Sequence, residues 1–296
     1  MIAAPIALPV HLRHLTVNQP KPGEKPGQKI KFVNPNSDNY ERNIAHAASL
    51  KLPCYKQDQL VVDGVKPTVV VVGSGPTLST PEVIAEVRKH VEAGALIFAC
   101  KAAIKILHDE GFKVDFAVNM EPGAHVAKPT KIFKSPGTTH IVASSCDPAL
   151  FDYLKDESVI IFHSATGYEN EVKMYQELFE TSTCMGGGYN VVNRAVSAAF
   201  FMGAGTVVLA GTDCGWRKDQ QMYADGPAHR EGVDMSDKGV IDGTEWMTRP
   251  DMLASGVALA KLAKKRPNDI IFIGDTLPSK LVLKDDEFLK QCASFN

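Results

Sequence analysis

A series of short and almost wholly apolar runs is the feature of this sequence that most constrains its fold. VVVV at 69–72 and VVLA at 207–210 have no polar residue at alternate positions. Strands that are apolar on both faces are typical of a parallel sheet covered by helices on both sides. The sequence predicts seven such strands, at 68–72, 95–99, 114–119, 140–144, 159–162, 206–210 and 270–273.

The segments between these runs have helical periodicity. In 83–91, valines and an isoleucine share one face, while charged residues lie around the other. The alternation predicts an α/β, Rossmann-like fold, in which a mainly parallel sheet has helices on both faces. Ligands of such folds bind beyond the carboxyl ends of the strands. The loops after Val72, Asn119 and Ala210 are therefore the candidate sites.

The chain divides into an N-terminal part, 1–64, and a larger part, 65–296. Within the first part, 18–36 contain four prolines and predict an extended arm, and 38–50 predict one short helix. The larger part is expected to be one Rossmann-like domain. Its most unusual feature is a long polar insertion at about 212–247, which we expect to form a lid, because loops of this length in compact domains are usually functional or disordered.

Composition excludes several classes of partner. Lys and Arg number 32 against 34 Asp and Glu, so no basic field favours nucleic acid or an anionic membrane. The six cysteines are too far apart for a zinc site or a disulfide scaffold, which favours a reducing compartment. Residues 1–10 have two prolines and no basic segment, unlike a signal peptide or membrane span. We expect a cytoplasmic protein with no membrane or nucleic-acid partner.

The first candidate site is the glycine loop after the strand at 68–72. Gly73 and Gly75 let the backbone turn sharply and approach a ligand, and the following helix offers free amides to an anion. A nicotinamide site would also need a third glycine and an acid at the end of the second strand, where this sequence has Lys101. The hydroxyls of Ser74 and Thr77 favour another polar ligand over a bare turn.

The second candidate site is a run of three glycines at 186–188, which precedes a helix expected at 189–202. Apolar residues surround most of this helix, so it should be buried, with its N-terminus directed at phosphate. Asn190, Asn193 and Arg194 interrupt the apolar surface near that end. They would contact a ligand, or Arg194 would satisfy a structural carboxylate or extend to solvent.

Two patterns inside and beside the insertion predict local structure. Asp242 and Gly243 predict a tight hairpin turn. Trp216 and Trp246 would stack on a sugar or base, or cover the edge of the core.

Two helix starts are predicted from capping boxes. Ser79 with Glu82 would open the helix after the glycine loop, and Thr248 with Asp251 would open the helix after the insertion. The glycine loop would then extend to about Ser79 before any helix begins.

Five segments in a fixed order carry a resemblance to a known family: VVGSGPTLS, GFKVDFAVNMEP, GGGYNVVNRAVSAAFFMGAGTVVLAGTDCGW, TRPDMLASG and NDIIFIGDTLPSKL. With them the chain resembles the family of bacterial motility accessory factors, which transfer nonulosonic acids to flagellin, and archaeal 6-hydroxymethylpterin diphosphokinases. It is also similar in fold to bacterial sialyltransferases that use CMP-sugars. The resemblance spans roughly 66–283 and implies that 65–296 form a nucleotide-binding transferase domain.

The resemblance also implies a set of site residues. Those expected to contact the nucleotide are Gly73, Ser74, Gly75, Pro76, Thr77, Asn119, Glu121, Gly186, Gly187, Gly188, Asn190, Gly211 and Thr212. Glu121 precedes Pro122, where the family commonly has an aspartate. Many relatives have a histidine followed by alanine in the insertion, whereas this chain has Tyr223 there and its nearest histidine is His229. The catalytic acid or base therefore stays open between Asp213, His229 and Tyr223.

Three functions follow from the resemblance. The leading one is a glycosyltransferase with a nucleotide-sugar donor, of the CMP-sugar type, in which His229 or Asp213 deprotonates the acceptor hydroxyl. The alternative is a diphosphokinase that transfers pyrophosphate from ATP to a pterin-like hydroxymethyl group, with Glu121 and Asp213 holding Mg²⁺. The third is a nucleotide-binding or structural protein without catalysis. Apart from Mg²⁺ in the second case, no cofactor is expected, and the acceptor is a protein, a glycan or a small molecule.

Overall fold

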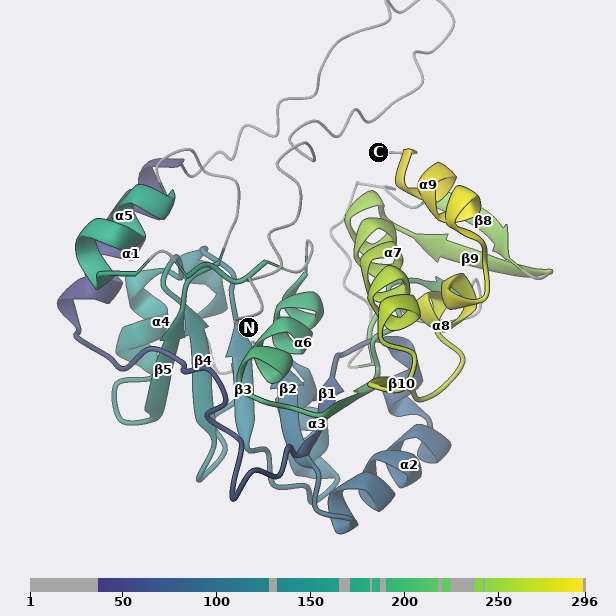
Figure 1. The fold of residues 1–296 in the computed structure, drawn as a ribbon, viewed down its shortest axis with the longest axis horizontal. Coiled ribbons are helices and arrows are strands. Elements are labelled where there is room, and N and C mark those ends of the chain that lie inside the picture. Colours follow the sequence, from purple (N-terminus) through teal and green to yellow (C-terminus); the bar gives the residue numbers. More distant parts are fainter. Residues whose placement is uncertain are drawn as a thin grey trace, which may run out of the picture.

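All seven apolar runs lie side by side in one sheet (Figure 1). The computed structural model describes residues 37–127, 132–164, 171–181, 183–186, 190–217, 220–224, 237–241 and 243–294. The strand order is β10-β6-β1-β2-β3-β4-β5, and every pair of neighbours is parallel. The strands are β1 Thr68–Val72, β2 Leu96–Cys100, β3 Phe116–Asn119, β4 Thr139–Ala143, β5 Ser158–Phe162, β6 Thr206–Ala210 and β10 Ile270–Phe272. The predicted α/β fold is confirmed, with every strand boundary within two residues.

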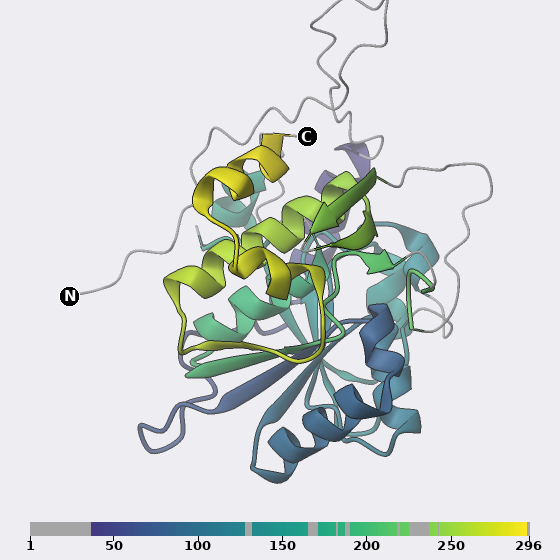
Figure 2. The ribbon, with the colours of Figure 1, turned by 90° about the vertical axis from the view of Figure 1, so that its right-hand side faces the viewer.

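Helices cover both faces of this sheet, as Figures 1 and 2 show. On one face α6 packs over β1, β2, β3 and β6, and the core there also includes residues of α1, α4 and α7. On the other face α2 and α3 form a second core. The helices are α1 Ser37–Ser49, η2 Pro76–Ser79, α2 Pro81–Glu92, α3 Ala103–Asp109, η3 Ala124–Val126, α4 Pro148–Tyr153, α5 Glu171–Phe179, α6 Val191–Phe201, α7 Pro250–Lys265, α8 Leu277–Val282 and α9 Asp286–Ser294. None of the described helices is long and apolar enough to cross a membrane.

The two ends of the polar insertion form a small antiparallel sheet of β7 Trp216–Arg217, β9 Thr244–Thr248 and β8 Asp237–Ile241. Ile241 pairs with Thr244, so the predicted turn at 242–243 is confirmed as a two-residue hairpin connection, with Gly243 at φ 75°. Asp242 itself lies outside the described residues.

Both tryptophans of the insertion are buried, and Trp246 is only 2% exposed. They therefore cover the core, and the expectation that they stack on a ligand is wrong. A lid stays a prediction for the segment between β7 and β8, of which 220–224 are described.

Neither predicted capping box forms. The N-cap of α2 is Thr80 and that of α7 is Arg249, without a side-chain cap at either. Ser79 instead donates its hydroxyl to the carbonyl of Pro76 within the short helix η2. Thr248 donates to the carbonyl of Cys214, at 2.8 Å, and so joins β9 to the loop after β6. A proline at the first position of each helix lacks the N–H that would need a cap.

The two other predicted helices are present. The helix expected at 38–50 is α1, and the extended arm proposed for 18–36 lies outside the described residues. The helix expected at 189–202 is α6, which starts at Val191 because Asn190 caps it: the side chain of Asn190 accepts a bond from the amide of Asn193, at 3.0 Å.

Candidate active site

The sheet order brings the predicted site segments to one edge. Strands β6, β1, β2 and β3 are neighbours and parallel, so their carboxyl ends emerge together. The glycine loop follows β1, Lys101 follows β2, Glu121 comes shortly after β3, and Asp213 comes shortly after β6. This edge is the candidate active site.

The glycine loop packs directly against the loop after β6. The amide of Gly75 donates to the carbonyl of Gly211, at 2.8 Å. A Cβ atom added to Gly73 would lie 2.5 Å from the same carbonyl oxygen, and Gly211 has a φ of +59°. These glycines therefore allow two backbones to approach each other, which is a structural requirement in addition to any ligand.

Asp213 lies beneath the glycine loop, where it is 3% exposed. Its carboxylate accepts a hydrogen bond from the hydroxyl of Thr77, at 2.9 Å, and a longer one from the amide of Thr77, at 3.4 Å. Burial raises the pKa of Asp213 to about 7, against the opposing effect of both bonds from Thr77. The site thus holds a carboxyl group that titrates near neutral pH, as a general base or acid does.

Glu121 is engaged by two cationic side chains. Its carboxylate contacts the ammonium of Lys101 and lies 3.0 Å from Nε2 of His125. Burial tends to raise the pKa of Glu121, but Lys101 and His125 outweigh this and hold the pKa below its ordinary value. No pattern in the sequence identified Lys101 or His125 as a site residue. The signal for Lys101 was its place at the end of the second strand, and that for His125 was its position four residues after Glu121.

The magnesium site proposed for Glu121 and Asp213 does not fit this arrangement. Their strands, β3 and β6, are three strand spacings apart, which is about 14 Å. The described residues contain no group of three His, Cys, Asp or Glu side chains that could hold a metal ion. The arrangement of the described residues therefore gives no support to a magnesium ion shared by these two carboxylates.

Asn119 is the last residue of β3, Thr212 comes two residues after the end of β6, and each is 2% exposed. Both polar atoms of the Asn119 amide and the hydroxyl of Thr212 have no hydrogen-bond partner in the described part of the chain. A buried polar group without a partner costs about 1–3 kcal/mol, so such groups usually bind a ligand or water. Their position supports the expectation that they contact the nucleotide.

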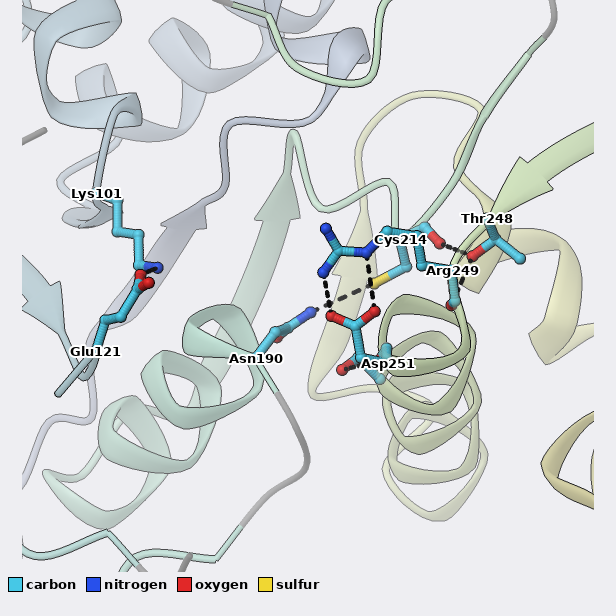
Figure 3. A network of polar contacts seen from close by, with 8 residues as sticks. Lys101, Glu121, Asn190, Cys214, Thr248, Arg249 and Asp251 are labelled. Carbon is cyan, nitrogen blue, oxygen red and sulfur yellow. Dashed lines mark hydrogen bonds and ion pairs between the residues drawn. The ribbon is translucent and has the colours of Figure 1, made fainter. Parts of the chain in front are cut away.

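The N-terminal end of α6 is held by protein contacts. Asn190 caps the helix and directs its amide nitrogen at the sulfur of Cys214, as Figure 3 shows. Arg194 donates to the carbonyl of Met185. The carbonyl of Met185 is therefore a structural partner of Arg194, and a contact between Arg194 and a ligand stays a prediction. Gly186 is described, whereas Gly187 and Gly188 lie outside the described residues, so the phosphate site expected there stays a prediction.

Of the remaining candidates, Tyr223 is half-buried beside the glycine loop: the amide of the next residue, Ala224, donates to the carbonyl of Ser74, at 3.0 Å. His229 lies outside the described residues. Pro76 and Thr77 are buried in η2, and the hydroxyl of Thr77 is used by Asp213. The structure therefore brings Asp213 and Tyr223 to the glycine loop and leaves the position of His229 open.

Comparisons with known proteins agree with this fold. The structure of a MAf glycosyltransferase from Magnetospirillum magneticum AMB-1 is similar at 21% identity and a TM-score of 0.56, over 88% of this chain and 41% of that chain. The likeness confirms the fold, and the chain spans about two fifths of that protein. No curated protein matches. The sequence model of a family described as 6-hydroxymethylpterin diphosphokinase MptE-like matches residues 38–219, which is more than half of the chain. The chain therefore belongs to the MptE-like family.

Proposed function

We propose that this protein is a nucleotide-dependent transferase, and specifically a glycosyltransferase with a nucleotide-sugar donor of the CMP-sugar class. The observation that carries the proposal is the pair of buried, unpartnered polar side chains, Asn119 and Thr212, at the strand edge that also presents the glycine loop. A nucleotide supplies hydrogen-bonding groups for such side chains and a phosphate for the loop and nearby cations.

A dinucleotide site is not supported by the residues at this edge. A nicotinamide cofactor is held through its ribose by an acid at the end of the second strand. β2 is followed by Lys101, which suits a phosphate better than a ribose hydroxyl.

The arrangement of the carboxylates favours sugar transfer over pyrophosphate transfer. Pyrophosphate transfer from ATP depends on metal ions that bridge the phosphates. Asp213 is buried against Thr77, and Glu121 is engaged by Lys101, so neither is placed as an open metal ligand. The family match is the one observation that favours the diphosphokinase, which we keep as the second candidate.

The proposed reaction assigns the protons as follows. The acceptor hydroxyl gives its proton to a base, for which Asp213, Tyr223 and His229 are the candidates. Its oxygen then bonds to the anomeric carbon of the donor sugar, while the bond from that carbon to the phosphate oxygen breaks and the nucleotide leaves. The raised pKa of Asp213 would let a carboxyl group accept this proton near neutral pH.

Ligand-dependent thermal stability tests the proposal. The melting temperature is measured with CMP, CMP-sialic acid, UDP-N-acetylglucosamine, GDP-mannose and ATP, each with and without Mg²⁺, because a ligand that binds only the folded state stabilises it. Stabilisation by CMP and its sugar without Mg²⁺ supports the glycosyltransferase. Stabilisation by ATP alone, and only with Mg²⁺, would favour the diphosphokinase. If none of these compounds changes the melting temperature, the proposed function is wrong and the third candidate, a structural protein, is favoured.

A further inference from the structure

Lys101 occupies an unusual backbone conformation at the centre of the candidate site. It follows β2 directly and has a φ of 49°, in the left-handed region that side chains other than glycine rarely adopt. Such a conformation is strained, and strained residues are concentrated at functional sites. A glycine would adopt this conformation without strain.

The register of the sheet places Lys101 between the glycine loop and Asn119. Val72 pairs with Ala99 on one side of β2, and Cys100 pairs with Val118 on the other. By the same register, Gly73 lies level with Cys100, and Asn119 lies level with Lys101. Lys101 is therefore one position beyond Gly73 and directly beside Asn119. Asn119 is the independent sign of a ligand here, because its buried amide has no partner among the described residues.

The ion pair that holds Lys101 is weak enough to be exchanged. The side chains of Lys101 and Glu121 are 36% and 32% exposed and meet at the ends of β2 and β3, as Figure 3 shows. Ion pairs with this degree of exposure contribute little to stability, because solvent screens the two charges. The phosphodiester of a nucleotide-sugar carries one full negative charge, as a carboxylate does, and the phosphate of free CMP carries up to two. Glu121 keeps His125 as a second partner when Lys101 turns to the phosphate.

We propose that Lys101 is a phosphate-binding residue of the donor site, and that Glu121 holds its ammonium until the donor phosphate replaces the carboxylate. The inference rests on the proposed function for the presence of a nucleotide at this edge, but it holds for either donor class. In this arrangement Glu121 competes with the ligand and is not a ligand itself. The two residues therefore have opposite effects on affinity.

The test measures the dissociation constants of CMP and inorganic pyrophosphate by calorimetry at low salt. Lys101→Met is expected to weaken binding about tenfold and to reduce its salt dependence, and Lys101→Arg to retain most of it. Glu121→Gln is expected to tighten binding about threefold. Lys105→Met is the matched control, because Lys105 is exposed on α3 and paired with Asp109. This variant should bind CMP and pyrophosphate with the affinity of the wild type.

Lys101→Gly separates function from folding. It should raise the melting temperature by about 2 °C through relief of the left-handed strain, yet lose affinity as Lys101→Met does. Equal affinity of Lys101→Met and wild type, or weaker binding by Glu121→Gln, would overturn the inference while leaving the proposed function intact. If neither CMP nor pyrophosphate binds the wild type, the proposed function fails, and the inference fails with it.

Discussion

The hydroxyl of Thr77 donates to the carboxylate of Asp213 across 2.9 Å, although the two residues are 136 positions apart in the sequence. This bond joins the glycine loop after β1 to the loop after β6. The same carboxylate is packed so closely under the loop that a Cβ atom on Gly75 would lie 2.7 Å from its Cγ. Asp213 therefore supports the shape of the loop as well as being a candidate base.

Replacing Asp213 by asparagine should change how stability depends on pH. The folded-state pKa of about 7 lies above the ordinary value of about 3.9, so the stability from this group is complete below pH 4 and is lost as the pH rises through 7. Asparagine imitates the neutral form. We expect Asp213→Asn to be more stable than wild type at pH 8, by up to a few kcal/mol, and equal to it near pH 4, while turnover is lost.

Urea unfolding at pH 4.5, 6 and 8 measures this difference. Asp152→Asn, on the exposed side of α4, is the control and should follow the wild type at every pH. If the free energy of unfolding changes with pH in the same way for wild type and Asp213→Asn, then Asp213 does not titrate in this range. Unfolding of the variant at all pH values would make Asp213 a structural residue of the β6 end.

Removing the hydroxyl of Thr77 should have the opposite effect on stability. Thr77→Val leaves the buried carboxylate of Asp213 without its shorter hydrogen bond, and bonds to charged groups contribute about 1.5–3 kcal/mol. We expect a loss of this size at pH 8 and a smaller loss at pH 5, because the neutral carboxyl depends less on the donor. Thr77→Ser should restore the wild-type value. A loss of stability that is the same at both pH values would mean that the methyl group replacing the hydroxyl packs poorly, and that the hydrogen bond to Asp213 contributes nothing.

The glycine loop should tolerate no side chain at Gly75. A Cβ atom there would lie 2.7 Å from the Cγ of Asp213 and 2.8 Å from the carbonyl oxygen of Gly211, both held in place. We expect Gly75→Ala to lower the free energy of unfolding by several kcal/mol. Gly111→Ala is the comparison, since it has open space but a φ of +79°, and should cost only about 1 kcal/mol. Similar losses in denaturant titration would contradict the packing argument.

The main sheet could be predicted from the sequence because its strands are buried on both faces, and a strand buried on both faces has a continuous apolar sequence. It also located the glycine loop and Asp213, because both directly follow such runs. Local patterns failed where a tertiary partner was available. Thr248 matched a capping box, but the carbonyl of Cys214 is 34 residues away in sequence and invisible to a local pattern. The Lys101–Glu121 pair likewise exists only because β2 and β3 are neighbours.

The buried amide of Asn119 offers a test of whether the site exists for a ligand. Without a ligand, an amide that is 2% exposed and has no partner among the described residues destabilises the fold, and an apolar group of the same size would not. We therefore expect Asn119→Leu to raise the melting temperature of the free protein by a few degrees and to abolish the stabilisation by CMP. Asn43→Leu is the control, because the amide of Asn43 donates to the carbonyl of Ser145 at 2.9 Å, and this variant should be destabilised. A lower melting temperature for Asn119→Leu would mean that water or protein satisfies the amide, and unchanged CMP binding would place the nucleotide away from β3.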